Sequence, residues 1–264
     1  DLAVTLDCGQ CFRFRQTGEN CFEGVACGRL LRLRQTPAEI LFLGVSEAEF
    51  ESVWRPYFDL DTDYAAIRAL LCQDPVMARA VSFAPGIRIL RQPSWEALLS
   101  FILSQNNNIP RIKASIEAFC KRYGSPLEEG FYSFPSRECL RGLRKEDLAG
   151  LGFGYRDQYI IDCVSRFLQG GIPLEDIRTL PLEHAREILL QVKGVGVKVA
   201  ECALLFGFHR LDAFPIDTWM KKGLSAYYPN GFPPAFASIR GIAQQYLFHY
   251  MRCCGEKVEN AANA

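Results

Sequence analysis

The sequence predicts an α+β protein, in which a β-rich N-terminal part is followed by helices alone. Two observations support this prediction. Short β-prone segments separated by turn signals fill residues 1–45, and from Ser46 onward the apolar residues recur at helical spacing. The length of 264 residues suits one large domain or two to three small ones around a cleft. We therefore expect an antiparallel β-rich domain with some helices over residues 1–92, and two all-helical domains flanking a cleft over residues 93–264.

Four segments in the first 45 residues have the composition of strands: "CFRFRQ", "CFEGVACG", "RLLRLRQ" and "EILFLGV". Thr17-Gly18 and Cys27-Gly28 supply turn residues between them. Three or four antiparallel strands are the simplest arrangement that connects segments this short.

Helices are predicted for the rest of the chain. "SEAEFESVWRPYF" begins with Ser46 and has Glu49 three residues later, the pattern of a capping box, and "DYAAIRALLCQDPVMARAVSFA" continues the helical rhythm. A helix then starts after Pro93, runs as the amphipathic "SWEALLSFILSQ" and stops at "NNNIP", and the next one, "RIKASIEAFCKRYG", ends at Gly124. The remaining helices are predicted in "SRECLRGL", "KEDLAGL", "DQYIIDCVSRFLQGG", "LEHAREILLQV", "KVAECALLFGF", "TWMKKGLSAYY" and "FASIRGIAQQYLFHYMR".

Composition and charge exclude several classes of protein. The chain is 49% hydrophobic and 23% charged, as in ordinary globular proteins, and no apolar run reaches the roughly 18–20 residues of a membrane span. Its 30 basic and 30 acidic side chains give a formal net charge of zero, so any nucleic-acid interface has to be a local feature. We expect no signal peptide and a reducing, cytoplasmic compartment.

The 11 cysteines do not have the spacing of a metal site. Cys8 and Cys11 form one CxxC pair, Cys253 and Cys254 are adjacent, and the others are scattered. No second CxxC or histidine pair completes a zinc site, and the sequence has only 3 histidines. We therefore predict free thiols and no catalytic metal.

The stretch "EILLQVKGVGVKVAECALLF" predicts a helix, a tight turn and a second helix, over about residues 185–207. Gly194 and Gly196 allow a sharp turn and leave no side chain between the backbone and a partner. The free N–H groups at the start of the second helix suit the capture of one nucleic-acid phosphate, with Lys193 and Val195 in the same turn. The alternative is a glycine-capped helix pair that only packs, and the glycines alone do not decide between the two.

Lys198 and Asp217 favour the functional alternative. Lys198 stands at the start of the second helix among apolar neighbours, where the helix dipole and the surroundings both disfavour the ammonium form. A neutral lysine is a nucleophile that can form a Schiff base with a sugar carbon. Asp217, in "FPID", can stabilise an oxocarbenium-like sugar cation as a base departs. The plainer alternatives are a lysine that extends to the surface and an aspartate that only caps a helix.

A helix-hairpin-helix with a lysine at the start of its second helix, followed by a loop that ends in an aspartate, resembles the helix-hairpin-helix DNA glycosylase superfamily. The resemblance implies that Lys198 is the nucleophile and Asp217 the catalytic aspartate. The proline usual in the family's hairpin is replaced by Lys193, which adds a charge for a phosphate contact. The iron–sulfur loop of some members is absent, because "CCGEKVEN" cannot supply its four cysteines.

Further motifs are similar to those of the 8-oxoguanine DNA glycosylase/lyase family, in the same order and across almost the whole chain: "CGQCFRFR", "SQNNNIPRI", "LGFGYRDQYI" and "AQQYLF". Such an enzyme takes a nucleotide out of the duplex and checks the partner base. The resemblance implies that Asn106 fills the vacated space and that Arg111 and Arg156 read the orphaned cytosine. Tyr155 is implied to act as an aromatic wedge beside it. Without the resemblance, "NNN" is a polar interhelical loop.

The same resemblance assigns a lesion pocket. 8-Oxoguanine carries a hydrogen on N7 that guanine lacks, and the Gly9 carbonyl is implied to accept it, a difference worth roughly 1–3 kcal/mol. Phe248 and Cys202 are implied to cover the two faces of the base, and Gln244 to contact its Watson–Crick edge. Taken alone, Cys202 is a buried helix cysteine.

Two further positions of the pocket depart from some members of the family. Trp219 and Met251 stand where those members carry a histidine and an aspartate, which indicates a bacterial or archaeal-like variant. The resemblance also implies a structural cation on the backbone carbonyls of Leu190, Val192 and Val195. No cofactor is required for the chemistry.

The leading hypothesis is a bifunctional DNA repair glycosylase that excises 8-oxoguanine opposite cytosine and nicks the abasic strand by β-elimination. Its expected partner is double-stranded DNA containing 8-oxoguanine:cytosine, with no membrane involved. We expect a monomer, nucleoid-associated in the cytoplasm of a bacterium or nuclear in a eukaryote.

Three alternatives stay open. A glycosylase for alkylated bases retains Asp217 but does not need Lys198. A non-catalytic helix-hairpin-helix DNA-binding module explains the glycines only. A nucleotide-binding metabolic enzyme needs a phosphate loop between a strand and a helix, and the sequence contains none.

Overall fold

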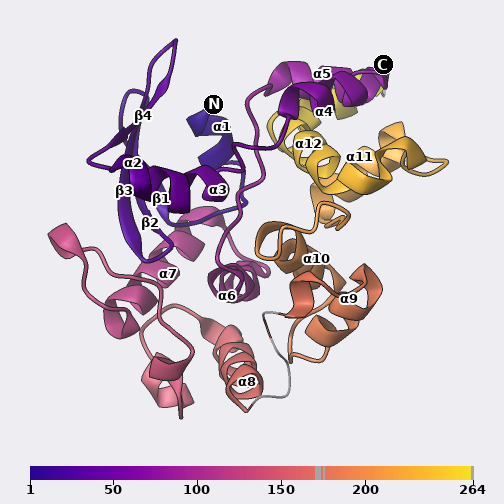
Figure 1. Ribbon diagram of the computed structural model, residues 1–264. Coiled ribbons are helices and arrows are strands. Elements are labelled where there is room, and N and C mark those ends of the chain that lie inside the picture. The colour runs from indigo at the N-terminus through magenta and orange to yellow at the C-terminus, as the bar shows by residue number, and fades with distance from the viewer. Residues whose placement is uncertain (170–173, 175, 263–264) are drawn as a thin grey trace.

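An antiparallel sheet lies at one side of the molecule (Figure 1). The structure, a computed structural model, describes residues 1–169, 174 and 176–262. The strands pair in sequence order: β1 (Phe14–Gly18), β2 (Cys21–Ala26), β3 (Arg29–Gln35) and β4 (Ile40–Leu43). Cys27 and Gly28 connect β2 to β3 with both residues in the left-handed region (φ 53° and 70°), as type I′ turns require. The predicted strands are confirmed, although the first begins at Phe14 and not at Cys11.

The first residues of the chain differ from the prediction, because they form a helix and not a strand. α1 (Leu2–Leu6) is capped by the Asp1 carboxylate, which accepts a hydrogen bond from Val4 N at 3.2 Å. Leu2 and Leu6 are buried in the same core as the sheet. The helix therefore closes one face of the sheet instead of extending it.

Residues 46–83 are helical, as expected, but in short pieces. These are α2 (Glu47–Glu49), the π-helical η1 (Phe50–Trp54), α3 (Arg55–Tyr57), α4 (Tyr64–Leu71) and α5 (Pro75–Phe83). Half of the predicted capping box is present, because Ser46 Oγ accepts a hydrogen bond from Glu49 N at 3.2 Å. The Glu49 carboxylate accepts a hydrogen bond from Trp54 Nε1 at 3.0 Å and so holds that buried ring in place.

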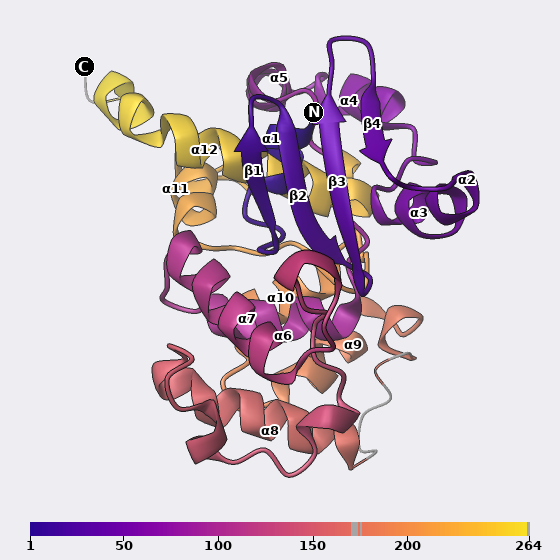
Figure 2. The ribbon, with the colours of Figure 1, turned by 90° about the vertical axis from the view of Figure 1, so that its left-hand side faces the viewer.

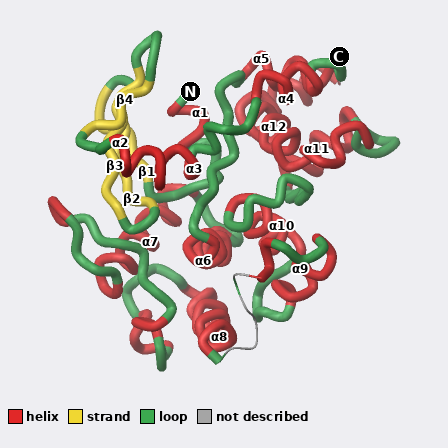
Figure 3. Tube along the Cα trace, in the orientation of Figure 1, coloured by secondary structure: helices red, strands yellow, loops and turns green. Residues whose placement is uncertain are grey.

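In the remainder of the described chain, loops connect helices and short 3-10 turns (Figure 3). They are α6 (Ser94–Ser104), α7 (Ile109–Tyr123), η2 (Glu128–Gly130), η3 (Glu138–Leu140), η4 (Lys145–Leu148), η5 (Gly154–Arg156), α8 (Asp157–Leu168), η6 (Asp176–Arg178), α9 (Leu182–Leu190), α10 (Val197–Phe206), α11 (Thr218–Tyr227), η7 (Pro234–Ile239) and α12 (Arg240–Ala262). The expected end of α8 at Gly170 and Gly171 lies outside the described residues. A helix that could span a membrane is not found in the part of the chain that the structure describes. The α+β class is confirmed.

Two details of these helices correct the predictions. α6 is not amphipathic: all its residues from Glu96 to Leu103 are buried, because the helix packs against α7, α8 and α10. Gly124 ends α7 as predicted, but in extended backbone (φ −80°, ψ 160°). A Cβ at Gly124 would lie 1.9 Å from the carbonyl oxygen of Ser133, so the glycine is required by this close approach and not by a left-handed turn.

Two apolar cores hold the molecule together. The smaller joins the sheet to α1, η1 and α3, and the larger runs through the later helices and includes Tyr64 and Leu71 of α4. α5 packs against α12, and Figure 1 shows α4 and α5 beside α12, at the opposite side from β4. Figure 2 shows the sheet above α6, α7 and α8. The domain boundary after residue 92 stays a prediction, and helices from both sides of it share the larger core.

A buried carboxylate connects the N-terminal part to the loop that follows α10. Asp59, 2% exposed and left-handed (φ 52°), accepts hydrogen bonds from Arg91 Nε at 2.9 Å and Tyr64 OH at 3.1 Å. His209 Nε2 lies 3.5 Å from the same carboxylate. Burial alone would raise the pKa of Asp59, but the contacts with His209 and Arg91 outweigh it and hold that pKa well below its usual range.

Replacing Asp59 with asparagine is expected to lower the free energy of unfolding at pH 7 by about 3 kcal/mol, because a buried charge pair is broken. Asparagine tolerates the left-handed backbone, so the loss reports on the charge. Because the folded-state pKa is depressed, this stabilisation is present above about pH 4 and is lost as the pH falls further. Urea unfolding at pH 7, 5 and 3 should show the gap between variant and wild type narrow at pH 3.

Asp61→Asn is the matched control for this measurement. Asp61 also pairs with an arginine, Arg55 at 2.8 Å, but its side chain is 67% exposed. Its replacement is expected to change the free energy of unfolding by less than about 1 kcal/mol. Two results would contradict the role of Asp59 as a buried charge. One is an equal loss in the free energy of unfolding for Asp59→Asn and Asp61→Asn, and the other is a loss for Asp59→Asn that does not change with pH.

Candidate active site

The predicted hairpin joins α9 to α10, and its two glycines are needed for different structural reasons. Gly194 is left-handed (φ 79°), and a Cβ there would lie 2.4 Å from the ring of Tyr159. Gly196 caps α10 in extended backbone, and nothing lies within 4 Å of the place where its Cβ would be. Gly194 is therefore required by conformation and packing. Gly196 leaves the first N–H groups of α10 open to an approaching anion.

Lys193 occupies the position of the hairpin where a proline was expected. Its backbone N–H donates a hydrogen bond to Asp162 Oδ2 at 2.8 Å, a bond that proline could not make. Asp162 also pairs with Arg166 on α8 at 2.8 Å. The replacement therefore ties the hairpin to α8 while the Lys193 side chain stays exposed.

One cavity brings together six of the predicted site residues. They come from the N-terminal segment, from α10, from the start of α11 and from α12: Gly9, Lys198, Cys202, Asp217, Gln244 and Phe248. The rest of its wall is formed by Phe101, Phe206, Pro215 and Gln245. Residues far apart in the sequence thus meet around one space.

Lys198 and Asp217 are both half-buried at this cavity. Lys198 Nζ lies 5.8 Å from the ring centroid of Phe101, so an aromatic face covers the amine on one side. Asp217 Oδ1 accepts a hydrogen bond from Met220 N at 2.8 Å and caps α11. Asp217 is therefore a helix cap and a residue of the cavity wall at once.

Cys202 lies one helical turn after Lys198 and is buried in the same wall. Burial raises the pKa of its thiol, the nearby Lys198 opposes the rise and Asp217 adds to it. Both charged groups therefore act on the thiol, which stays protonated at neutral pH. A protonated thiol presents a soft, uncharged surface to the cavity.

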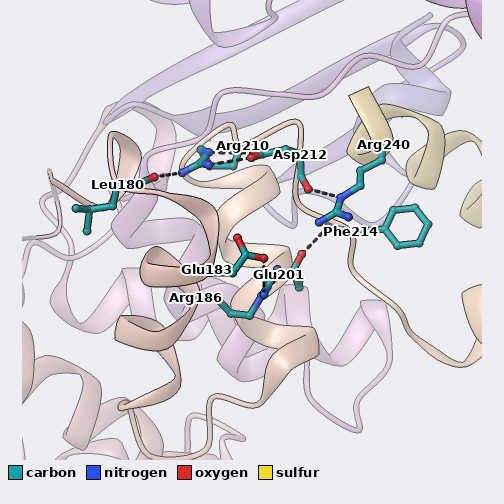
Figure 4. A network of polar contacts seen from close by, with 8 residues as sticks. All are labelled: Leu180, Glu183, Arg186, Glu201, Arg210, Asp212, Phe214 and Arg240. Atoms are coloured by element: carbon teal, nitrogen blue, oxygen red, sulfur yellow. Dashed lines mark hydrogen bonds and ion pairs between the residues drawn. The ribbon is translucent and has the colours of Figure 1, made fainter. Parts of the chain in front are cut away.

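A buried glutamate holds the loop that leads to Asp217 (Figure 4). Glu201 of α10 is 3% exposed, and its Oε2 accepts a hydrogen bond from Phe214 N at 2.5 Å. Its Oε1 accepts one from Arg186 Nε of α9, also at 2.5 Å. The helix that carries Lys198 is thus bonded to the loop that carries Asp217.

The other end of this loop is fixed by arginines (Figure 4). Arg210 pairs with Asp212 at 2.8 Å and donates to the carbonyl of Leu180 at 2.5 Å. Arg240 of α12 donates to the carbonyl of Asp212. Two helices, α10 through Glu201 and α12 through Arg240, therefore restrain the loop, and with it the position of Asp217.

The loop around Gly9 presents one unbonded carbonyl. The carbonyl of Asp7 accepts a hydrogen bond from Arg252 at 2.8 Å, that of Cys8 from Gln245 at 3.0 Å and that of Gln10 from Gln92 at 2.7 Å. The carbonyl of Gly9 accepts none from the described residues. Gly9 itself is left-handed (φ 85°), a conformation that favours glycine.

Gln244 is also incompletely bonded. It is 4% exposed, and its Oε1 is buried without a hydrogen-bond partner among the described residues. Buried polar atoms are nearly always paired, so an unpaired oxygen in a cavity wall indicates a ligand that donates to it. Phe248 stands one turn further along α12 and supplies an apolar face next to that amide.

The residues predicted to contact the orphaned base gather at a second place, where the turn between α6 and α7 meets η5. Asn106 is exposed and left-handed (φ 46°), and Tyr155 is 48% exposed. Arg156 is 4% exposed and donates to the carbonyls of Gln105, at 2.8 Å from Nε, and Asn106, at 2.9 Å from Nη2. Arg156 therefore braces the turn that presents Asn106. Its contact with a cytosine stays a prediction.

Arg111 lies nearby, at the first turn of α7. It is exposed and borders a hollow that Lys145, Phe153 and Gly154 also line. The side chain is thus available to a partner at this hollow.

Two predicted pocket residues stand away from the cavity wall. Met251 is buried against α11, where a Cβ on Gly223 would lie 3.0 Å from its Cγ. Trp219 is half-buried and its ring lies 5.3 Å from Lys222 Nζ. Their predicted contribution to the pocket remains a prediction. All 11 cysteines are free thiols in this structure.

Five further residues at the site were not predicted from the sequence. Four of them line the cavity and the fifth binds the loop of Gly9: Phe101, Phe206, Pro215, Gln245 and Arg252. The spacing on α12 could have found two of them. Gln245, Phe248 and Arg252 are separated by three and four residues and so share one face of the helix.

Two family models match consecutive parts of the chain. The model of the 8-oxoguanine DNA glycosylase N-terminal domain matches residues 1–98. The model of the HhH-GPD superfamily base excision DNA repair protein matches residues 99–232. Together they account for the sheet, the hairpin and Asp217.

Curated relatives include N-glycosylase/DNA lyases. The chain is 30% identical over 231 residues to the enzyme of Arabidopsis thaliana, a match that covers 82% of this chain and 63% of the relative. It is 31% identical over 231 residues to a probable N-glycosylase/DNA lyase of Methanothermobacter thermautotrophicus, covering 75% of this chain and 73% of the relative. The chain thus spans less than two thirds of the Arabidopsis protein.

Solved structures show the same architecture. The 8-oxoguanine glycosylase/lyase of Clostridium acetobutylicum, bound to double-stranded DNA with cytosine opposite 8-oxoguanine, is 37% identical with a TM-score of 0.92, over 97% of this chain and 92% of that one. A 3-methyladenine DNA glycosylase of Archaeoglobus fulgidus shares the fold, with a TM-score of 0.69 over 89% of this chain and 88% of that one, at 20% identity.

Proposed function

The chain belongs to the HhH-GPD superfamily of base excision DNA repair proteins, and on that premise we propose that it removes 8-oxoguanine opposite cytosine from duplex DNA and then nicks the abasic strand. One observation carries the proposal: a single cavity is lined by an amine, a carboxylate and a set of apolar and amide surfaces. A non-catalytic DNA-binding module would leave this set without a use.

The chemistry begins with Lys198. After loss of a proton, its amine forms a bond to C1′ as the N9–C1′ bond breaks, and the base departs with the bonding electrons and takes up a proton. The Asp217 carboxylate stabilises the positive charge that develops on the sugar during this exchange. Loss of an amine proton and opening of the sugar ring give a protonated Schiff base between Lys198 and C1′. Removal of a proton from C2′ then expels the 3′-phosphate and nicks the strand.

Lesion reading is assigned to the two unbonded acceptors. The Gly9 carbonyl suits the N7 hydrogen of 8-oxoguanine and repels the N7 lone pair of guanine. Gln244 Oε1 suits a donor on the Watson–Crick edge of the base. Phe248 and Cys202 cover the ring faces. A base that satisfies both acceptors is favoured over one that satisfies only Gln244.

The exposed group around Asn106 and Tyr155 supports the other half of the proposal. A flat, half-exposed aromatic side chain can stack in a kinked duplex, and a left-handed asparagine can enter the space of the extruded base. Arg111, exposed beside the hollow that Phe153 and Gly154 also line, offers a guanidinium to a base or a phosphate. The partner is double-stranded DNA, bound by a monomer.

We extend the proposal to a structural cation at the hairpin. The backbone carbonyls of Leu190, Val192 and Val195 are hard oxygen donors, the class that alkali and alkaline-earth ions prefer. Such an ion would fix the conformation of the turn. The chemistry would be carried out by Lys198 and Asp217 and needs no cofactor.

Base release from three duplexes tests the proposed function. Under single-turnover conditions, a duplex with 8-oxoguanine opposite cytosine should lose the lesion, whereas an undamaged duplex and one with an alkylated purine should not. Gln244→Leu should slow release of 8-oxoguanine roughly 10- to 100-fold, because its hydrogen bond to the base is lost. Gln73→Leu, which removes an exposed amide on the surface, should leave the rate unchanged. Release of the alkylated purine alone would move the assignment to the alkylation-repair alternative.

A further inference from the structure

The cavity wall depends on a loop that the last helix holds in place. The loop of residues 7–10 carries Gly9, the residue assigned to read N7 of the lesion. Gly9 lies between helix α1 and the start of the sheet and has no side chain of its own to anchor it. Its position therefore has to be set by what binds its neighbours.

Two side chains of α12 bind those neighbours. Gln245 Nε2 donates to the Cys8 carbonyl at 3.0 Å, with donor and acceptor both buried. Arg252 Nη2 donates to the Asp7 carbonyl at 2.8 Å. Both bonds are made to backbone oxygens of the two residues before Gly9. Together they fix the orientation of the backbone immediately before the glycine.

Arg252 also touches the other reading element of the cavity. Its guanidinium carbon lies 5.8 Å from the ring centroid of Phe248, the distance of a cation–π contact. Its Nη1 lies 3.5 Å from the place where a Cβ of Gly9 would be, and Phe248 Cε1 lies 3.8 Å from the same place. Arg252, Phe248 and Gly9 thus pack as one unit at the cavity wall.

We propose that Arg252 and Gln245 are positioning residues that set lesion specificity, by holding the Gly9 carbonyl at the one place in the loop where it stays free to accept a hydrogen bond. The inference rests on the proposed function, since it assigns how the same site distinguishes 8-oxoguanine from guanine. Neither residue touches the reacting atoms. Their loss leaves the Gly9 peptide free to rotate, and the hydrogen bond from the N7 hydrogen of 8-oxoguanine to the Gly9 carbonyl is then lost.

The test compares binding to two duplexes, one with 8-oxoguanine opposite cytosine and one undamaged. All proteins carry Lys198→Gln, so that no substrate is consumed while affinity is measured. Arg252→Met and Gln245→Met are each expected to weaken binding of the lesion duplex about ten-fold and to change binding of the undamaged duplex less than about two-fold. Arg252→Lys retains a donor and a charge and should recover part of the discrimination.

Lys113→Gln is the matched control. Lys113 contacts the same loop, because it donates hydrogen bonds to the Asp7 carboxylate at 3.4 Å and to the carbonyl of Phe14 at 3.0 Å. It does not bond the backbone carbonyl of Asp7 or of Cys8. Its loss removes a positive charge from the loop and should leave discrimination unchanged. Thermal unfolding of each variant separates a local effect from a loss of folding.

The outcomes distinguish the inference from its premise. If the parent Lys198→Gln protein does not prefer the lesion duplex, the proposed function is wrong. If it does prefer that duplex, and Arg252→Met lowers the affinity for both duplexes by the same factor, Arg252 is a phosphate contact and the inference fails. Unchanged discrimination in Arg252→Met also overturns it, even where Gln245→Met does not fold.

Discussion

Replacing Lys198 with glutamine is expected to abolish the covalent adduct that borohydride captures between this protein and a duplex carrying 8-oxoguanine opposite cytosine. An amide nitrogen is not nucleophilic, so no bond to C1′ forms and there is no Schiff base to reduce. Base release should fall by roughly 10³-fold or more, because removal of a nucleophile eliminates the covalent route altogether. Single-turnover kinetics on a labelled duplex, with and without borohydride, measure both effects.

The structure supplies the controls for this result. Lys198 is half-buried, and glutamine has a similar length, so the free energy of unfolding should change little. Lys121→Gln removes a lysine from the exposed end of α7 and should form the adduct normally. Clean base release by Lys198→Gln at the wild-type rate would instead make the protein a monofunctional glycosylase that uses water.

The second large effect is expected for Asp217→Asn, because the two roles of this side chain can be separated. Asparagine accepts the hydrogen bond of Met220 N as well as aspartate does, so the cap of α11 is retained. The negative charge is lost, and with it the stabilisation of the sugar cation. Base release should fall roughly 10²- to 10³-fold while the melting temperature stays nearly constant.

Asp217→Ala and Asp63→Asn complete this experiment. Alanine removes both charge and cap, so it should lower the free energy of unfolding by about 1 kcal/mol in addition to the loss of activity. Asp63 caps α4 by accepting hydrogen bonds from Ala65 and Ala66 at 3.0 Å, and its replacement by asparagine should affect neither property. Wild-type kinetics for Asp217→Asn would reduce Asp217 to a structural cap.

Local sequence patterns were sufficient for most of the secondary structure. The Cys27-Gly28 turn was identifiable because its glycine stands between two β-prone segments, and the structure places both residues in the left-handed region. α1 could not be identified by periodicity, since Leu2–Leu6 is little more than one turn long. α6 was misjudged because Glu96 and Ser100 have the composition of a solvent-facing side, although both are buried between helices.

In the candidate site, too, residues placed by local sequence could be predicted, whereas residues placed by long-range contacts could not. Lys198 and Asp217 stand at helix starts that their own neighbours in the sequence define, so their positions could be predicted. Gln245 and Arg252 act on residues 237 and 245 positions away in the chain, and no local pattern carries that information. Arg156 also illustrates the limit: only the fold shows its guanidinium bonded to backbone carbonyls of the α6–α7 turn.

Because α12 lies late in the chain, a nascent polypeptide acquires the residues assigned to catalysis before those assigned to lesion reading. A chain that has left the ribosome as far as α11 already contains the reactive pair Lys198 and Asp217. It does not yet contain Gln244, Phe248 or Arg252, and the Gly9 loop is unsupported until α12 docks. Under the proposed function, a truncated translation product therefore retains the amine but lacks the residues assigned to hold an extruded base against it. The proposed DNA cleavage would then become available only once synthesis has passed α12, the helix to which lesion reading is assigned.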